Sequence, residues 1–347
     1  MKKILIYTTL VIGFSLLMEV FLQLTEVSLP NPIGVDQKVG KILIPDSRIN
    51  LIKEGLYLGE VNEYGYLGPG YPTERTPGAI RIALMGDSYV EAYQLFEQFN
   101  FRTVLENTLN NSESEKFEVL NFGRSGMNFG TMYTYYENYV KQFEPDIVLF
   151  VIGGDDFVIK NQNLFPGLKI DNQNNLVFTD GFKNSTLYKL RQKYSYLFGI
   201  STFELLKKSA KLVSEGYLLH ILFDKLNPEP LFTGKPKKAS DVEYTSSPRI
   251  DSNSVKILSK IFENFNNDGK TKFAIVARGE LDQNYISLIK ECEIKYLPLY
   301  KYVNSLKTDN FDPNYWKGTN KRGHWNHTTH QFVGEYLAKY LKNEFIN

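Results

Sequence analysis

The sequence predicts an α/β fold, namely a three-layer α/β/α sandwich around a mostly parallel sheet, preceded by an N-terminal transmembrane helix. Two observations predict this fold class. Short apolar segments alternate with helical segments along most of the chain, which is typical of a parallel sheet covered by helices. A nearly uncharged apolar stretch at residues 4–24 comes before them and is long enough for one membrane span.

The alternation gives an ordered set of expected elements. Strands are expected at the short apolar runs, which are residues 82–85, 117–122, 147–152, 272–277 and 294–297. Helices are expected at the longer segments between and after them, which are residues 89–110, 130–143, 254–266, the stretch after Asp282, and 328–341. All the predicted strands are short and apolar, so we expect helices on both faces of the sheet.

The domain organisation follows from where this alternation begins and lapses. Residues 1–25 are expected to be a transmembrane anchor or signal segment, and residues 26–54 contain Pro and Asp and are expected to be a tether. The α/β domain is expected to fill residues 55–347. Its pattern lapses at about residues 161–250, where polar loops and a segment rich in Lys and Pro predict an insertion.

The N-terminal stretch has the charge distribution of a membrane anchor. Lys2 and Lys3 precede the apolar run, which only Glu19 interrupts, and 21 helical residues span roughly 31 Å. The two lysines place the short end in the cytoplasm, so the globular part is expected outside it, as a single-pass protein. The alternative is a cleaved signal peptide and a secreted protein, although no convincing cleavage site follows the run.

Composition limits the partners of the chain. The net charge is +1 and no basic stripe is present, so a nucleic-acid partner is not expected. Cys292 is the only cysteine, which excludes an internal disulfide. His324, His327 and His330 do not have the spacing of a known metal site, so neither a metal nor another cofactor is expected.

Four short polar blocks follow strands or precede the last helix. They are Gly86-Asp87-Ser88, residues 121–126, residues 153–156, and residues 323–326, which include His324. The carboxyl edge of a parallel sheet is where open α/β folds bind ligands. A serine nucleophile needs a base such as histidine and backbone amides directed at the oxyanion. These blocks therefore predict nucleophilic catalysis by Ser88.

In their order and content, these blocks resemble those of the SGNH (GDSL-type) hydrolases. The resemblance covers roughly residues 60–160 and 310–345 and implies an SGNH or flavodoxin-like sandwich. It implies that Ser88 is the nucleophile, that His324 is the base, and that the amides of Ser88 and Gly126 form part of the oxyanion hole. The family completes this hole with an asparagine from the third block.

The chain departs from that pattern at two positions. Asp155 stands in the asparagine position, and an ionised carboxylate cannot donate a hydrogen bond to an oxyanion. Asp155 is therefore a candidate for the third oxyanion donor only in its protonated form; the alternative is a loop residue that caps a helix or pairs with a basic side chain. The family also has an aspartate two or three residues before its histidine, where this chain has Lys321 and Arg322. Asp312 is the candidate for the missing acid; the alternatives are a Ser-His dyad or a backbone carbonyl that orients the ring of His324.

Together these observations predict a serine esterase or acyltransferase that uses an acyl-enzyme. The expected substrates are O-acyl esters, and the resemblance together with the predicted location implies an envelope glycan as their carrier. The expected partners are this ester substrate and the membrane. The alternative is a catalytically impaired member of the same fold that serves as a binding or assembly component of the cell envelope, and the two altered positions motivate it.

Overall fold

The computed structural model of the protein describes residues 2–26, 28–52, 54–111, 115–157, 164–214 and 252–346. Its centre is a five-stranded sheet with the order β11-β10-β7-β5-β6, in which every neighbouring pair is parallel. The strands are β5 (Ala79–Gly86), β6 (Lys116–Asn121), β7 (Ile147–Ile152), β10 (Lys272–Ala277) and β11 (Lys295–Leu297). Each overlaps a strand that the apolar runs predict.

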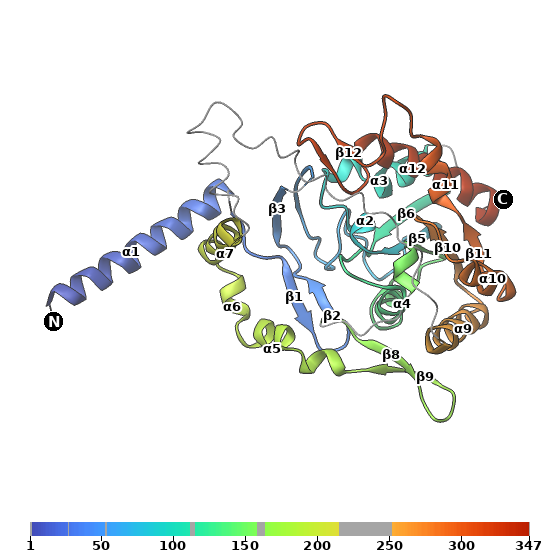
Figure 1. The fold of residues 1–347 in the computed structure, drawn as a ribbon, viewed down its shortest axis with the longest axis horizontal. Helices are drawn as coiled ribbons and strands as arrows, with labels where there is room; N and C mark the ends of the chain where they lie inside the picture. Colours follow the sequence, from blue (N-terminus) through green and yellow to red (C-terminus); the bar gives the residue numbers. More distant parts are fainter. Residues whose placement is uncertain are drawn as a thin grey trace.

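Both faces of the sheet are covered by helices, as the continuous apolar strands indicate. In the central strand β7, Val148 and Phe150 face one core, whereas Leu149 and Val151 face the other. The first core is closed by α4 (Phe129–Asn138), α9 (Ser252–Asn267) and α10 (Gln283–Glu291). The second is closed by α3 (Phe101–Asn110), α11 (Leu299–Ser305) and α12 (His327–Leu341). The predicted three-layer sandwich is therefore confirmed (Figure 1).

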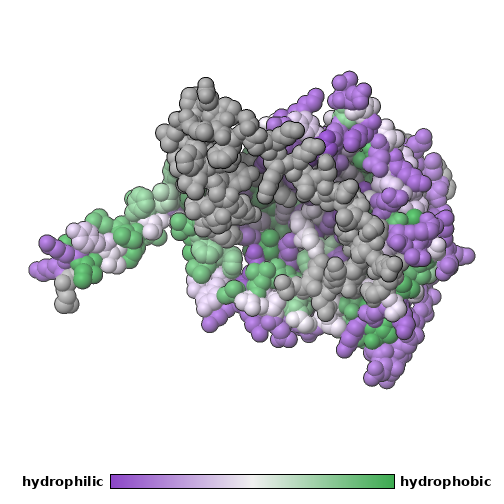
Figure 2. Space-filling view, in the orientation of Figure 1, coloured by the Kyte–Doolittle hydropathy of each residue, from purple (hydrophilic) through white to green (hydrophobic). Residues whose placement is uncertain are grey.

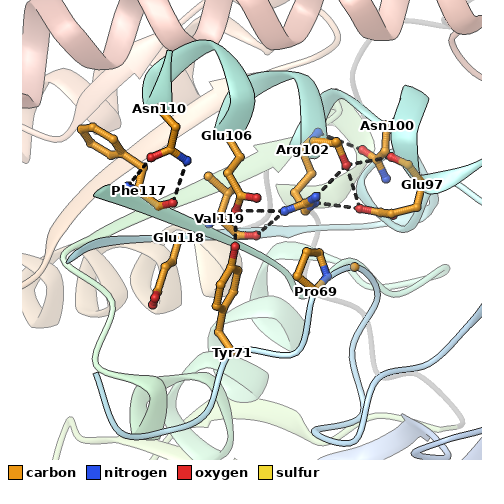
Figure 3. Close-up of polar contacts among 12 residues, drawn as sticks. Pro69, Tyr71, Glu97, Asn100, Arg102, Glu106, Asn110, Phe117, Glu118 and Val119 are labelled. Atoms are coloured by element: carbon orange, nitrogen blue, oxygen red, sulfur yellow. Dashed lines mark hydrogen bonds and ion pairs between the residues drawn. The ribbon is translucent and has the colours of Figure 1, made fainter. Parts of the chain in front are cut away.

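Helix α3 is fixed to the sheet by buried charges (Figure 3). The guanidinium of Arg102 contacts Glu97 at 2.7 Å and Glu106 at 3.0 Å, and it also donates to the carbonyl of Val119 on β6. Glu106 accepts a further hydrogen bond from the hydroxyl of Tyr71. Because each charge has a partner, the burial of this group does not leave an isolated ion.

The segment expected to be a tether is instead folded onto the domain. It forms the antiparallel hairpin of β1 (Ile33–Asp36) with β2 (Gly40–Leu43), and the strand β3 (Arg48–Ile52), which pairs antiparallel with β4 (Leu56–Glu60) just beyond the segment. Leu43, Ile49 and Tyr57 from these hairpins are buried in a small core of their own. The Pro and Asp residues of this segment lie at the turns and edges of the hairpins. Their abundance resembles the composition of a linker, which is why the sequence predicts one here.

The predicted insertion forms an arm along one side of the domain. It contains the hairpin of β8 (Gly167–Ile170) and β9 (Leu176–Thr179), followed by α5 (Thr186–Lys193), α6 (Ser195–Phe198) and α7 (Ser201–Ser214). The rest of the insertion, including its segment rich in Lys and Pro, lies outside the described residues. Figure 1 shows the arm reaching the base of α1 (Lys2–Thr25), which projects from the body.

Helix α1 is, among the described helices, the one that is long and apolar enough to cross a membrane. The remaining elements are short. They are α2 (Ser88–Glu91), β12 (Tyr315–Trp316), β13 (Lys321–Arg322), the 3₁₀ helices η1 (Glu97–Phe99), η2 (Val140–Phe143), η3 (Gly154–Phe157) and η4 (Gly181–Asn184), and a π-helical turn η5 (Lys342–Ile346).

Candidate active site

Ser88 lies at the carboxyl end of β5, at the first position of the short helix α2. The side chain of Asp87 caps this helix by accepting a hydrogen bond from the amide of Tyr89 at 3.0 Å. Position 86, just before Asp87, must be glycine, because a Cβ at Gly86 would overlap the side chain of Val90. The Gly-Asp-Ser sequence thus turns the chain sharply and presents the serine hydroxyl at the edge of the sheet.

The structure brings Ser88 and His324 together, although 236 positions separate them in the sequence. The serine Oγ lies 2.7 Å from Nε2 of His324, which is hydrogen-bond distance for proton transfer. Both side chains are partly exposed, so a substrate has access to the hydroxyl. The ring of Tyr89 packs against the imidazole with its centroid 4.6 Å away.

The acid that contacts the imidazole is Glu54, from the turn between β3 and β4. Its Oε1 lies 3.1 Å from Nδ1 of His324, and both side chains are largely shielded from solvent. A carboxylate at Nδ1 favours the tautomer that carries its proton there. The unprotonated Nε2 is then the nitrogen that faces Ser88 and accepts its proton.

Asp312, the candidate from the sequence, does not contact His324. Its carboxylate pairs with the guanidinium of Arg322 at 2.7 Å and accepts a hydrogen bond from the amide of Asn314. Arg322, one of the residues in the position of the family's aspartate, therefore holds Asp312 away from the imidazole. The structure places Glu54 where the sequence suggested Asp312.

The loop before α12 is shaped to admit Glu54. A Cβ at Gly323 would overlap the carboxyl group of Glu54, so the close approach requires glycine there. The loop is held in place by the indole of Trp316, which donates to the carbonyl of His324 at 2.9 Å, and by a reciprocal pair of hydrogen bonds between Asn314 and Gly323. These contacts fix the imidazole relative to both of its partners.

The loop that carries Gly126, the second expected oxyanion donor, is hydrogen-bonded to the turn that carries Ser88, because the amide of Arg124 donates to the carbonyl of Gly86 at 3.0 Å. Gly126 is exposed, has φ of +89°, and a Cβ there would meet no atom within 4 Å. Within the described residues, the amides of Ser88 and Gly126 donate to no protein acceptor. Two free backbone amides at the end of a parallel strand are the donors that a developing oxyanion needs.

Two buried charged side chains form hydrogen bonds to Ser125, the residue whose carbonyl shares a peptide group with the Gly126 amide. Lys41 of β2 donates to the carbonyl of Ser125 at 2.8 Å, and this carbonyl belongs to the same peptide group as the Gly126 amide. The carboxylate of Glu91 accepts hydrogen bonds from both the amide and the hydroxyl of Ser125. Burial lowers the pKa of Lys41, whereas the nearby charge of Glu91 raises it.

Asp155 lies in η3, immediately after β7, but its side chain lies outside the described part of the structure. The next residue, Asp156, faces inward and accepts a hydrogen bond from the amide of Gly153 at 2.6 Å. Arg278, which follows β10, bridges Asp156 at 3.2 Å and Asp87 at 2.6 Å. This bridge connects the loops after three strands at the same edge.

The other two histidines of the last block have separate surroundings. His330 is fully buried on α12, and its Nδ1 accepts a hydrogen bond from the amide of Phe101. Burial lowers the pKa of His330 to about 3. His327 is exposed and packs against Trp316. Over the described residues, no group of three His, Cys, Asp or Glu side chains is arranged to hold a metal ion.

Sequence reasoning missed Glu54, Lys41 and Arg278. Glu54 and Lys41 lie in the segment interpreted as a tether, 270 and 84 positions respectively from the groups they contact. Arg278 did carry a signal, because it directly follows the apolar strand β10, as Ser88 follows β5. A polar residue at the end of a strand of the same sheet is a candidate for the site.

Solved structures similar to this chain include several ester hydrolases. A lipolytic protein of the G-D-S-L family from Desulfitobacterium hafniense DCB-2 is 12% identical, with a TM-score of 0.37 over 75% of this chain and 98% of its own. The psychrotrophic esterase EstA from Pseudoalteromonas sp. is 11% identical, with a TM-score of 0.39 over 77% and 99%. The lipase/acylhydrolase from Enterococcus faecalis is 11% identical, with a TM-score of 0.38 over 76% and 96%.

At these identities and with TM-scores below 0.5, the likenesses do not assign an activity to this chain. No protein-family model matches the sequence, and no curated protein matches it. The functional assignment therefore depends on the geometry around Ser88.

Proposed function

We propose that this chain is a serine esterase or acyltransferase of the SGNH type that acts on O-acyl esters, with an envelope glycan as the carrier. The single observation behind this proposal is the continuous hydrogen-bonded chain from Ser88 Oγ through His324 to Glu54. A nucleophile, a base and an orienting acid in this order form the arrangement that activates a serine hydroxyl.

The proposed reaction moves one proton and forms one acyl-enzyme. Nε2 of His324 takes the proton of Ser88 while Oγ forms a bond to the ester carbonyl carbon. The amides of Ser88 and Gly126 bind the resulting oxyanion. When the C–O bond to the alcohol breaks, the imidazolium returns the proton to the leaving oxygen. Water or a sugar hydroxyl then attacks the acyl-enzyme while Nε2 of His324 takes its proton. The bond between the acyl carbon and Oγ of Ser88 breaks, and the imidazolium returns the proton to Oγ.

Glu54 keeps the imidazole in the required tautomer and stabilises its positive charge after proton transfer. Its carboxylate is shielded from solvent, which strengthens its interaction with the imidazolium. No step needs a cofactor. The third oxyanion donor of the proposed site is Asp155, whose carboxyl group can donate only in its protonated form.

We further propose that α1 anchors the protein in a membrane, with the α/β domain outside the cytoplasm. Support comes from the contacts of its C-terminal part with the body. Leu22 is only 2% exposed, and the carboxylate of Glu19 bonds to the start of α7. A leader that is cleaved off would not need such contacts. The glycan carrier is inferred from this location together with the family resemblance.

A fluorophosphonate probe tests the proposed nucleophile directly, because it phosphonylates an activated serine. The full chain in detergent should be labelled, and Ser88→Ala should abolish the labelling. Ser259→Ala is the matched control: this serine lies on α9, and within the described residues its hydroxyl donates to the helix carbonyl of Val255 alone, so labelling should persist. A folded protein that is not labelled would overturn the enzymatic proposal and favour the binding or assembly component.

A further inference from the structure

The C-terminal part of α1 is hydrogen-bonded to the arm formed by the insertion. One oxygen of Glu19 accepts from the amide of Ser201 at 2.8 Å, and the other accepts from the amide and hydroxyl of Thr202 at 2.8 Å. Glu19 therefore occupies the N-terminus of α7, where a carboxylate satisfies free amides and complements the helix dipole. The first turn of α7 and the last two turns of α1 are neighbours.

This contact limits the distance between the α/β domain and a bilayer that α1 crosses. The part of α1 before Glu19, residues 2–18, spans roughly 26 Å at 1.5 Å per residue. The hydrocarbon core of a bilayer is about 30 Å thick. When this part fills the core, the start of α7 lies at the boundary between the hydrocarbon and the headgroups.

The rest of the arm lies at the same level. In Figure 1, α7, α6 and α5 follow one another across the axis of α1, beside its base. The arm exposes large apolar side chains, namely Leu187, Leu190, Tyr196 and Leu206, each at least 42% exposed. Leu187 and Leu190 are three positions apart on α5 and therefore share a face. Figure 2 shows hydrophobic surface continuing from α1 onto the body near α7.

The charge of the arm matches an anionic surface. Between Asp180, which pairs with Lys183, and the buried Glu204 of α7, the arm carries Lys189, Arg191 and Lys193 and no acidic residue. Lys189 and Lys193 are exposed next to the apolar side chains of α5. A helical segment that combines exposed Leu and Tyr with lysines has the composition of an amphipathic element at a membrane surface. Basic residues near an anionic bilayer add to the attraction between the protein and the membrane.

We propose that α5–α7 form a platform that rests in the headgroup layer of an anionic phospholipid bilayer, next to the point where α1 enters it. The platform comprises Leu187, Leu190, Tyr196 and Leu206 with Lys189 and Lys193. It holds the α/β domain at a fixed orientation to the membrane. This inference goes beyond the ester chemistry and rests on the proposed anchoring by α1.

Depth-dependent quenching of a fluorophore tests the platform in the full chain. In a Cys292→Ser background, single cysteines are introduced as Leu190→Cys on the platform, Phe14→Cys within α1, and Gln283→Cys on α10. Each is labelled with an environment-sensitive fluorophore, and the protein is reconstituted into vesicles with phosphatidylglycerol and doxyl lipids. We expect a blue shift and strong quenching at positions 190 and 14 and neither at position 283.

The three labels separate the two proposals. Quenching at position 14 without quenching at position 190 would overturn the platform and leave the anchor intact. Lack of quenching at both positions would overturn the anchor and the platform together. The ester chemistry is measured independently, by the reactivity of Ser88.

Charge reversal tests whether the platform contacts anionic lipid. The pair Lys189→Glu and Lys193→Glu should reduce the quenching at position 190 in vesicles with phosphatidylglycerol, whereas Lys290→Glu on α10 should not. Equal quenching of both variants would contradict the electrostatic part of the proposal. A protein partner in place of lipid would leave the label unquenched in pure lipid vesicles.

Discussion

The carboxylate of Glu54 lies 3.1 Å from Nδ1 of His324, and 270 positions separate the two residues in the chain. A turn between two N-terminal hairpin strands thus reaches the loop before the last helix and completes a Ser-His-Glu chain. The N-terminal hairpins are for this reason part of the proposed catalytic machinery.

Replacing the acid should remove most of the activity and leave the fold intact. Glu54→Gln preserves the size of the side chain but cannot stabilise the imidazolium, and it permits the wrong tautomer of His324. We expect kcat on an acyl ester to fall by roughly 10²- to 10⁴-fold, by comparison with the known loss for triad amide variants. Ester hydrolysis by the purified full chain measures this change.

Asp312→Asn is the matched control for Glu54→Gln. Its carboxylate pairs with the largely exposed guanidinium of Arg322, and the asparagine keeps a side-chain oxygen that can accept from the amide of Asn314. We expect its activity to remain close to that of the unaltered protein. If Asp312→Asn lost as much activity as Glu54→Gln, the assignment of Glu54 as the acid would be wrong.

Lys41 should affect catalysis through the oxyanion donor. Its ammonium bonds the Ser125 carbonyl and thereby holds and polarises the peptide that supplies the Gly126 amide. Loss of a direct oxyanion donor costs about 10²- to 10³-fold in kcat, so loss of its support in Lys41→Met should cost roughly tenfold. The expected effect is on kcat with little change in KM, because the oxyanion exists only near the transition state.

The exposed Lys38→Met, three positions away, provides the control for Lys41→Met and should retain full activity. Lys41→Arg keeps the charge and should recover part of kcat. A rise in KM with unchanged kcat would show that Lys41 acts on substrate binding and would contradict the role in positioning the peptide.

Asp155→Asn restores the amide that the resemblance implies at this position. If the carboxyl group of Asp155 donates a hydrogen bond to the oxyanion, the enzyme is active only while this group is protonated. The asparagine variant should then lose this dependence of kcat on pH. We therefore expect kcat of Asp155→Asn to equal or exceed that of the unaltered protein above neutral pH. Profiles of kcat against pH that coincide for both proteins would rule out a donor role for this side chain.

Much of the fold could be predicted because it depends on local patterns. The strand at residues 147–152 is apolar throughout and is found with the same bounds, and Ser88 and His324 are recognisable from motifs beside their elements. Glu54 could not be predicted, because no local pattern connects a hairpin turn to a loop 270 positions away. Residues 26–54 have the composition of a tether, and their folding onto the domain depends on long-range packing, with Leu43 only 1% exposed.

His330 should make the stability of the protein depend on pH. Burial lowers its pKa from 6.5 to about 3 in the folded protein. Below pH 6.5 the unfolded chain therefore binds a proton that the folded protein does not, and stability that is complete above this pH is lost progressively toward pH 3. The loss amounts to about 2 kcal/mol between pH 6.5 and 5, at 1.36 kcal/mol per pH unit.

His330→Gln removes this titration while keeping an acceptor on the side chain near the amide of Phe101. Denaturant unfolding of the full chain in detergent, at pH 6.5 and at pH 5, gives the free energy of unfolding of both proteins. The unaltered protein should lose about 2 kcal/mol more than His330→Gln over this interval, because only its unfolded chain gains the extra proton. Parallel losses in the two proteins would show that His330 does not titrate differently on unfolding.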